Sequence, residues 1–346
     1  MHAYIPARAA FTRTHSILRT LCTLVAVALL FQTFAPAFAA SNSLHALTAK
    51  KGVAAAKFGP GTVAAANAGW YYNWRSSPNS GSAPAGTVAP EYVPMLAKAA
   101  DVTDQNIATL TAGKNSGAYK YLLGFNEPDL ASQANMTVAQ AIDLWPKYLA
   151  TGLTLGSPAP TGPNAWFDDF LAQAQAKGYR IDFICLHYYR PPNSTTAVAD
   201  LKKWLTDAYA KFKKPIWLTE FGAPDCKSLG WCGSNAATLT QAQVDAFVPE
   251  VVAMLESLPF VERYAWFVDR TQGGFELSFV FNADGSLSPT GKALRDAPTL
   301  ALVRNPWNLG APMPRLLPGL FDADGKTMRA SASPRIGFAY GLPAPR

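Results

Sequence analysis

The sequence predicts a (β/α)8 barrel, an eight-stranded parallel barrel surrounded by helices, over residues 40–296. Short apolar segments alternate with helical patterns along this stretch, which is typical of a parallel sheet whose strands are joined by helices. About 250 residues is also the usual size of one such barrel. The eight apolar segments begin at residues 52, 69, 92, 121, 153, 181, 215 and 261.

Five helical patterns separate these predicted strands. They cover residues 104–112, 138–149, 165–176, 197–212 and 241–258. Two of them follow a threonine that is itself followed three residues later by glutamine, Thr137 with Gln140 and Thr240 with Gln243. In this pattern the two side chains satisfy each other's backbone N–H groups at the start of a helix. The start of each of these helices is therefore well marked.

Residues 1–39 have the composition of a secretory signal peptide. Three arginines precede an apolar run from Leu21 to Ala35, and the small residues of Ala37-Phe38-Ala39 supply a cleavage site. A membrane anchor is the alternative, but the run is shorter than the roughly 20 residues that a membrane span needs. We therefore expect an exported protein, secreted or periplasmic, with no membrane association after signal removal.

Residues 297–346 form a predicted C-terminal extension. They hold 8 of the chain's 27 prolines and show no sustained periodicity. The three signal-peptide arginines and the extension, with six basic and two acidic residues, account for the formal charge of +7, since 21 basic and 21 acidic residues remain between them. A neutral barrel argues against nucleic acid and polyanionic ligands. We expect a monomer that acts on a neutral polysaccharide without a cofactor.

The cysteines predict one disulfide. Cys226 and Cys232 flank a short loop, and an exported chain can oxidise such a pair. A zinc site is the alternative, but no matching pair of histidines lies nearby, so we expect no bound metal. Cys185 falls within an apolar strand, where a buried free thiol is expected.

Two of the predicted strands end in glutamate. One apolar run stops at Asn126-Glu127-Pro128, where the proline cannot continue the strand ladder, and another stops at Glu220. Three βα units separate the glutamates, which places them across the mouth of the barrel, where catalytic groups gather. For Asn126-Glu127-Pro128 alone a turn cap is the simpler interpretation. The second strand of the same design favours a catalytic pair, as retaining glycoside hydrolysis requires.

Aromatic and polar residues cluster at the same predicted strand ends. In a sugar-binding cleft, aromatic rings stack on the apolar faces of pyranoses while amide and hydroxyl groups fix their orientation. Asn126 is expected to bind the 2-hydroxyl of the reacting sugar. The other candidate substrate-binding residues are Tyr72, Trp74, His187, Tyr189 and Trp266.

Eight sequence blocks, taken in order between residues 50 and 270, resemble glycoside hydrolase family 128, which also contains fungal cell-wall proteins. The resemblance implies endo-acting, retaining hydrolysis of β-1,3-glucan on a (β/α)8 barrel, with Glu127 as acid/base and Glu220 as nucleophile. One departure is Ala97, where the family usually has a tryptophan. The blocks are Trp70–Trp74, Glu91–Leu96, Leu122–Asp129, Gln133–Met136, Gly156–Ala159, Trp166–Phe170, Asp182–His187 and Leu218–Phe221.

Two other functions fit part of this pattern. A retaining hydrolase of another neutral β-glycan, such as β-1,4-glucan, mannan or xylan, would keep both glutamates and alter the aromatic rim. A non-catalytic β-glucan-binding barrel would keep the aromatic residues but would not need both glutamates. The presence of Glu127 and Glu220 together therefore favours an enzyme.

Overall fold

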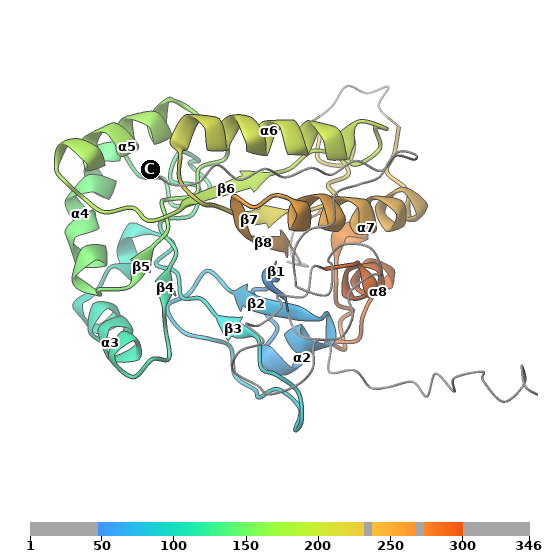
Figure 1. The fold of residues 1–346 in the computed structure, drawn as a ribbon, viewed down its shortest axis with the longest axis horizontal. Coiled ribbons are helices and arrows are strands. Elements are labelled where there is room, and N and C mark those ends of the chain that lie inside the picture. Colours follow the sequence, from blue (N-terminus) through green and yellow to red (C-terminus); the bar gives the residue numbers. More distant parts are fainter. Residues whose placement is uncertain (1–47, 232–236, 268–272, 300–346) are drawn as a thin grey trace, which may run out of the picture. The chain divides into compact units, whose positions relative to one another are not determined.

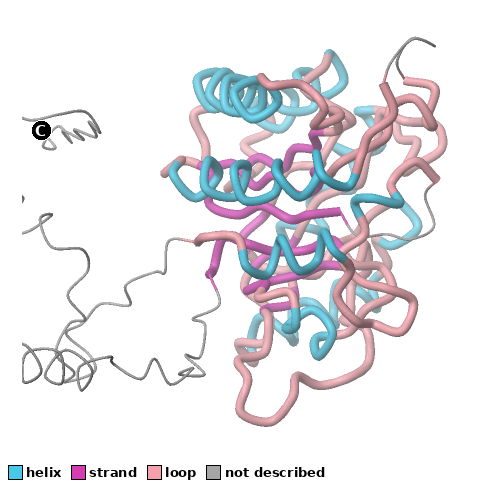
Figure 2. Tube along the Cα trace, turned by 90° about the vertical axis from the view of Figure 1, so that its right-hand side faces the viewer, coloured by secondary structure: helices cyan, strands magenta, loops and turns pink. Residues whose placement is uncertain are grey.

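The computed structural model describes residues 48–231, 237–267 and 273–299, and it has a central set of parallel strands with helices outside them (Figure 1). Most connecting loops gather at one end of the strands (Figure 2). The strands are β1 (Thr48–Ala54), β2 (Ala68–Tyr72), β3 (Glu91–Tyr92), β4 (Tyr121–Leu122), β5 (Thr154–Leu155), β6 (Ile184–Tyr188), β7 (Ile216–Phe221) and β8 (Val261–Phe267).

Single backbone bridges close the strands into a barrel. Six strands pair in the order β3-β2-β1-β8-β7-β6, and β4 pairs with β5. A parallel bridge between Met95 and Leu123 joins β3 to β4, and one between Gly156 and Phe183 joins β5 to β6. The predicted (β/α)8 barrel is therefore confirmed, with short strands on the β3–β5 side of the ring.

The helices follow the predicted pattern closely. All five predicted helices are present as α3 to α7, and the reciprocal caps of Thr137 with Gln140 and of Thr240 with Gln243 both form. Two shorter helices, α2 and α8, have too few turns to give a periodic signal. The helices are α2 (Pro60–Ala65), α3 (Asp104–Asn115), α4 (Val138–Ala150), α5 (Ala165–Ala176), α6 (Ala197–Phe212), α7 (Gln241–Ser257) and α8 (Pro289–Asp296).

Two segments of the sequence prediction lie mostly outside the described residues. The predicted signal peptide does so entirely, and the C-terminal extension does so except for residues 297–299. Both segments remain predictions. Within the described part of the chain, no helix combines the length and apolar character of a membrane span.

The barrel has one core inside the strands and another between the strands and the helices. Alternate strand residues point to opposite faces, so Trp70 and Tyr72 of β2 enter the inner core while Tyr71 joins the outer one. The inner core is largely aromatic, and Trp217 packs between Trp70 and Phe183 with ring centroids 5.2 and 4.1 Å away. Each fully buried ring contributes about 1.5–3 kcal/mol of transfer free energy.

The amino-terminal side of the inner core contains a buried arginine. The Arg263 guanidinium lies 4.5 Å from the Trp217 ring centroid and 4.7 Å from that of Tyr121. Its Nη2 forms an ion pair of 2.6 Å with Glu91. Cation–π contacts and a paired carboxylate offset the cost of burying this charge, so the barrel interior is filled rather than open.

Glycine makes room for the bulky rings. A Cβ on Gly52 of β1 would lie 2.4 Å from the Trp70 Nε1 atom. That ring is held in place because its N–H donates to the Lys50 carbonyl oxygen at 2.9 Å. The Trp70 ring cannot move away from an added Cβ at residue 52, so this position requires glycine.

We predict that Gly52→Ala lowers the free energy of unfolding by about 1–3 kcal/mol, the usual cost of overpacking a dense core. Gly162→Ala is the matched control, because no atom lies within 4 Å of its added Cβ. That variant is expected to stay within about 0.5 kcal/mol of the parent. Urea denaturation of both variants measures the difference, and equal stabilities would contradict the packing argument.

Candidate active site

Glu127 and Glu220 lie at the carboxyl ends of β4 and β7. Glu220 is the penultimate residue of β7, and Glu127 follows the bridge that pairs Asn126 with Ala159. Their exposed fractions are 9% and 5%. The barrel therefore brings two nearly buried carboxyl groups to its mouth from segments 93 residues apart in the sequence.

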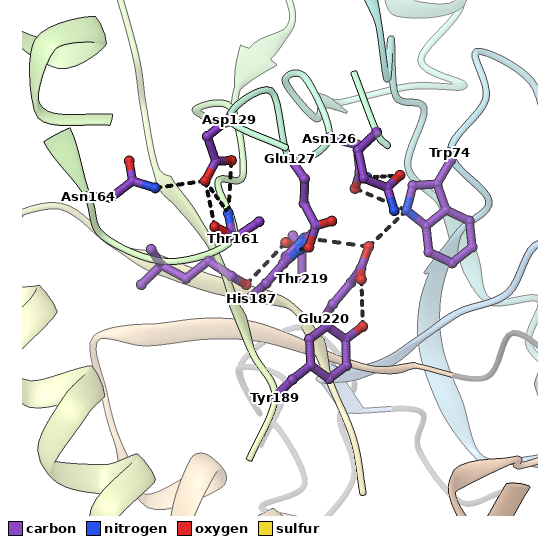
Figure 3. Close-up of polar contacts among 12 residues, drawn as sticks. Trp74, Asn126, Glu127, Asp129, Thr161, Asn164, His187, Tyr189, Thr219 and Glu220 are labelled. Atoms are coloured by element: carbon purple, nitrogen blue, oxygen red, sulfur yellow. Dashed lines mark hydrogen bonds and ion pairs between the residues drawn. The ribbon is translucent and has the colours of Figure 1, made fainter. Parts of the chain in front are cut away.

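A histidine from β6 lies between the two carboxyl groups (Figure 3). His187 Nδ1 is 3.0 Å from Glu127 Oε1, and its Nε2 is 3.5 Å from Glu220 Oε1. One carboxylate oxygen of each glutamate and one ring nitrogen of His187 lie within 4.8 Å of one another. The three groups form a compact buried cluster that faces the cleft.

Three further donors hold the Glu220 carboxylate. The Tyr72 hydroxyl and the Trp74 indole N–H donate to Oε1 at 2.9 and 2.8 Å, and the Tyr189 hydroxyl donates to Oε2 at 2.6 Å. Both oxygens therefore accept hydrogen bonds from fixed rings. This arrangement orients the carboxylate and stabilises its charge.

Burial and neighbouring charges shift the titration of the cluster. Burial is the main cause that raises the pKa of Glu220, and the Glu127 charge adds to the rise. The His187 charge and the hydrogen bonds from Tyr189 and Trp74 oppose the rise without cancelling it. Burial lowers the pKa of His187, but the Glu220 charge and the contact with Glu127 raise it above its ordinary value. Glu220 and His187 therefore each retain a proton to higher pH than they would as isolated side chains.

The two tyrosines beside Glu220 remain proton donors. Burial raises the pKa of Tyr72 and of Tyr189 well above the ordinary value, and the Glu220 charge raises both further. A neutral phenol is the form that can donate to a carboxylate. Both phenols therefore keep their protons to higher pH than an ordinary tyrosine and stay able to donate to Glu220.

Glu127 has an unusual backbone conformation. Its φ angle is 41°, in the left-handed region that non-glycine residues rarely adopt. Hydrogen bonds hold it there, since its N–H donates to the Ala159 carbonyl at 2.7 Å and its own carbonyl accepts from Leu130 N–H at 3.0 Å. Strain of this kind costs about 1–3 kcal/mol and is found where a side chain must be aimed at a site.

Asp129 connects the loop that carries Glu127 to the loop after β5 (Figure 3). Its carboxylate accepts from the Thr161 backbone N–H at 3.1 Å and from the Asn164 side-chain amide at 2.7 Å. Asn164 in turn caps α5 by accepting from Phe167 N–H at 3.1 Å. Asp129 thereby anchors the Glu127 loop to the first turn of a helix.

The cluster opens into a cleft of about 1240 Å³. The cleft has an aromatic side, built from the ends of β2, β6 and β8, the loops after β7 and β8 and helix α6, and a polar side from the loops after β3, β4 and β5. Ala97 lines the cleft on the polar side, so the position where the sequence resemblance led us to expect a tryptophan presents only a methyl group. The aromatic residues are Trp74, Tyr188, Tyr189, Trp204, Trp231, Phe267 and Phe275, and those of the polar side include Lys98, Ser132, Gln133 and Thr161.

The structure places five of the six predicted substrate-binding residues in two different settings near the cleft. Asn126, Trp74, His187 and Tyr189 line the cleft. Tyr72 is fully buried behind Glu220, so it holds the carboxylate instead of offering a free face to a ligand. These residues therefore form two layers, one at the cleft surface and one beneath it.

The prediction for Trp266 is wrong. Its side chain is fully buried on the outer face of β8, where it packs on Phe221 and Phe247 and donates to the Ser278 carbonyl at 2.8 Å. The next residue, Phe267, lines the cleft instead. The alternation of side chains along a strand could have shown this, because Ala265 and Phe267 share the inner face of β8 whereas Trp266 points outward.

Several cleft residues were not predicted from the sequence. Phe275 and Trp231 come from the loops after β8 and β7, and Trp204 and Asp200 come from α6. None of them ends a strand, so a search of strand ends cannot find them. Their spatial position depends on how the loops fold back over the barrel.

The cluster of Glu127, His187 and Glu220 also has a spacing that could hold a metal ion. Donors already occupy both Glu220 oxygens, and His187 Nδ1 contacts the Glu127 carboxylate. A carboxylate surrounded by N–H and O–H groups is prepared for negative charge without a cation. The prediction that the protein works without a metal remains a prediction.

An eight-stranded α/β barrel with two buried glutamates at the carboxyl ends of its strands fits the chemistry of glycoside hydrolysis. The family model described as "Glycosyl hydrolase catalytic core" matches residues 54–294. The chain belongs to this class of enzymes, and within it to glycoside hydrolase family 128.

Two solved structures illustrate the relationship. An endo-β-1,3-glucanase of family 128 subgroup I from Amycolatopsis mediterranei, in complex with laminaripentaose, is 39% identical with a TM-score of 0.62 and covers 72% of this chain and 100% of its own. A subgroup II endo-β-1,3-glucanase from Sorangium cellulosum is 27% identical with a TM-score of 0.60, over 72% of this chain and 99% of its own.

A curated relative extends the comparison to fungi. Alkali-sensitive linkage protein 1 of Schizosaccharomyces pombe is 29% identical over 235 residues, which is 64% of this chain. The aligned part spans only 39% of that relative's length. The likeness therefore concerns the barrel and not the whole fungal protein.

The predicted disulfide concerns the loop after β7, beside the cleft. Cys226 is buried at the start of this loop, whereas Cys232 lies outside the described residues, so the pairing stays a prediction. We expect mass spectrometry of the protein, purified without reductant, to show the two cysteines in one linked peptide. Closure of so short a loop contributes about 2 kcal/mol. Alkylation of both thiols without prior reduction would rule the bond out.

Proposed function

We propose that this enzyme hydrolyses internal bonds of β-1,3-glucan with retention of configuration, by a double displacement at two glutamates. The observation that carries the proposal is the close approach of Glu127 and Glu220, because one carboxylate oxygen of each lies within 4.8 Å of the other at the cleft. Retaining enzymes separate their carboxyl groups by about 5–5.5 Å, whereas inverting enzymes leave about 6.5–9.5 Å for a water molecule. The observed spacing favours the retaining route.

Glu220 is the proposed nucleophile. It accepts hydrogen bonds from Tyr72, Trp74 and Tyr189, which favour its ionised form and fix its direction of attack. In the first step one of its oxygens bonds to the anomeric carbon as the glycosidic bond breaks. The product of this step is a covalent glycosyl-enzyme.

Glu127 is the proposed acid and base. It donates a proton to the departing glycosidic oxygen in the first step and removes a proton from water in the second, when water releases the sugar from Glu220. His187 contacts both carboxyl groups and keeps a proton in the cluster. Its charge moderates the repulsion that two neighbouring carboxylates would otherwise exert.

Asn126 is the proposed ligand of the 2-hydroxyl. Its Oδ1 accepts from the Trp74 indole at 3.2 Å, and its Nδ2 donates to Gln133 at 3.3 Å. An amide nitrogen carries two hydrogens, so one remains for a sugar hydroxyl. A contact to this hydroxyl strengthens as charge develops on the ring, which lowers the barrier.

The choice of polysaccharide rests on the cleft and the relatives together. Aromatic faces with polar groups opposite suit a neutral sugar chain, and the barrel segment has equal numbers of acidic and basic residues. The linkage is taken from the endo-β-1,3-glucanases of Amycolatopsis mediterranei and Sorangium cellulosum. Action on a neutral polysaccharide also fits the proposed export of the chain to the periplasm or the medium.

Product analysis on curdlan and laminarin tests the proposal. We expect a ladder of β-1,3-linked oligosaccharides, with weak or no release from cellulose, mannan or xylan. Proton NMR of the first products is expected to show the β anomer before mutarotation. Degradation of a β-1,4-linked polymer in place of laminarin would favour the alternative hydrolase, and tight binding without cleavage would favour the non-catalytic barrel.

The nucleophile assignment predicts the behaviour of Glu220→Gly. Laminarin hydrolysis is expected to fall to background, because no group remains to form the covalent intermediate. Azide fits the vacated space and attacks directly, so added azide is expected to restore turnover and yield a glycosyl azide of inverted configuration. Rescue with retained configuration would assign the nucleophile to another residue.

The acid/base assignment predicts a substrate-dependent loss in Glu127→Gln. Hydrolysis of laminarin is expected to fall about 10²–10⁴-fold, since its poor leaving group needs a proton. Formation of the intermediate from an activated aryl β-glucoside of laminaribiose needs no such help and is expected to fall far less in a pre-steady-state burst. Equal losses on the two substrates would count against this role.

A further inference from the structure

Trp231 is an exposed aromatic residue that the proposed chemistry does not use. It is 57% exposed, although it lines the cleft. The described residues include three other large hydrophobic side chains of comparable exposure, Val88, Leu130 and Tyr209, and none of these three is an aromatic residue of the cleft. An apolar ring left open to solvent inside a binding cleft is typical of a ligand contact.

A row of rings connects Trp231 to Glu220. Tyr189, whose hydroxyl donates to Glu220, packs edge-to-face on Phe275 at a centroid distance of 5.3 Å. Phe275 then packs edge-to-face on Trp231 at 6.1 Å. Trp231 therefore lies two ring contacts from Tyr189, the residue whose hydroxyl donates to the Glu220 carboxylate.

The backbone on either side of this row is fixed by hydrogen bonds. The Asp225 N–H donates to the Gly274 carbonyl at 2.7 Å, which joins the loop after β7 to the loop that carries Phe275. Trp231 N–H donates to the Cys226 carbonyl at 2.9 Å and closes the turn that presents the indole. A ring held in place before binding loses little conformational entropy when a ligand stacks on it.

Asp225 stabilises the same turn from within. Its carboxylate accepts from the Ser228 hydroxyl at 2.6 Å and from Lys227 N–H at 3.3 Å, and the Ser228 hydrogen bond is the largest cause that lowers the pKa of Asp225. Gly230 in this turn has a φ angle of 67°, which glycine adopts without strain. The sequence thus supplies the turn residues that hold Trp231 at the cleft.

We infer that Trp231 is a stacking platform for a glucosyl unit outside the catalytic position, so that it selects for longer glucan chains. The inference rests on the proposed function, because it names a binding position for the same polysaccharide. An indole face suits the apolar face of a pyranose, while the polar residues across the cleft contact its hydroxyl edge. A chain too short to reach Trp231 gains nothing from it.

Chain-length dependence tests this inference. In Trp231→Ala, kcat/KM is expected to fall about tenfold on laminarihexaose, equivalent to about 1.4 kcal/mol, and less than about twofold on laminaritriose. Trp231→Phe keeps an aromatic face and is expected to recover part of the loss. Tyr209→Ala is the control, since this residue is 38% exposed, stacks on Phe260 of the α7–β8 turn and lies outside the cleft.

Two outcomes would overturn the inference while leaving the proposed function intact. One is an active Trp231→Ala enzyme with unchanged kinetics on both oligosaccharides. The other is an equal loss on both with a lowered melting temperature, which would indicate a structural role. A binding measurement tests the role of Trp231 separately from the proposed catalytic function. Calorimetry measures laminarihexaose binding to Glu220→Gln and to the double variant that also carries Trp231→Ala. An absence of binding to Glu220→Gln itself would refute both proposals.

Discussion

The burial of two neighbouring carboxyl groups is the constraint on which the site depends. Like charges this close repel strongly where water is scarce, and an unpaired buried charge costs several kcal/mol. The barrel offsets this cost by placing His187 between the two carboxyl groups and three hydrogen-bond donors on the Glu220 carboxylate. These partners come from the end of β6, which is paired with β7, and from the end of β2, which β1 and β8 separate from β7. The charged site therefore exists only when the barrel has closed.

A densely packed core on the amino-terminal side of the barrel and loops held by hydrogen bonds support this arrangement. Arg263 and the rings around it fill the amino-terminal side of the barrel, so the cleft opens only at the carboxyl ends of the strands. Above the core, Asp129 fixes the loop of Glu127, and the contact of Asp225 with Gly274 fixes the loops on the far side. Rigid loops on a filled barrel keep catalytic groups within the small tolerances that their chemistry requires.

Local signals explain which parts of the fold could be predicted. The five longer helices have a clear apolar period, and the helix caps at Thr137 and Thr240 mark two of their starts. The first strand begins at Thr48 rather than near Gly52, because the alanine-rich segment that follows has little strand character. The short helices α2 and α8 lacked enough turns to reveal a period. The error at Trp266 arose because an aromatic at a strand end was assigned to the cleft without regard to which face it occupies.

The sequence by itself determined the barrel and the positions of both glutamates, since strand periodicity and chain order place Glu127 and Glu220 at the same rim. It also identified four residues that line the cleft, because they end strands. Only the tertiary structure decided that His187 lies between the carboxyl groups, that Tyr72 lies beneath the surface and that Trp231 enters the cleft. The reason is physical: periodicity is a property of neighbouring residues, whereas distances across a barrel depend on strand register, side-chain direction and loops that fold together.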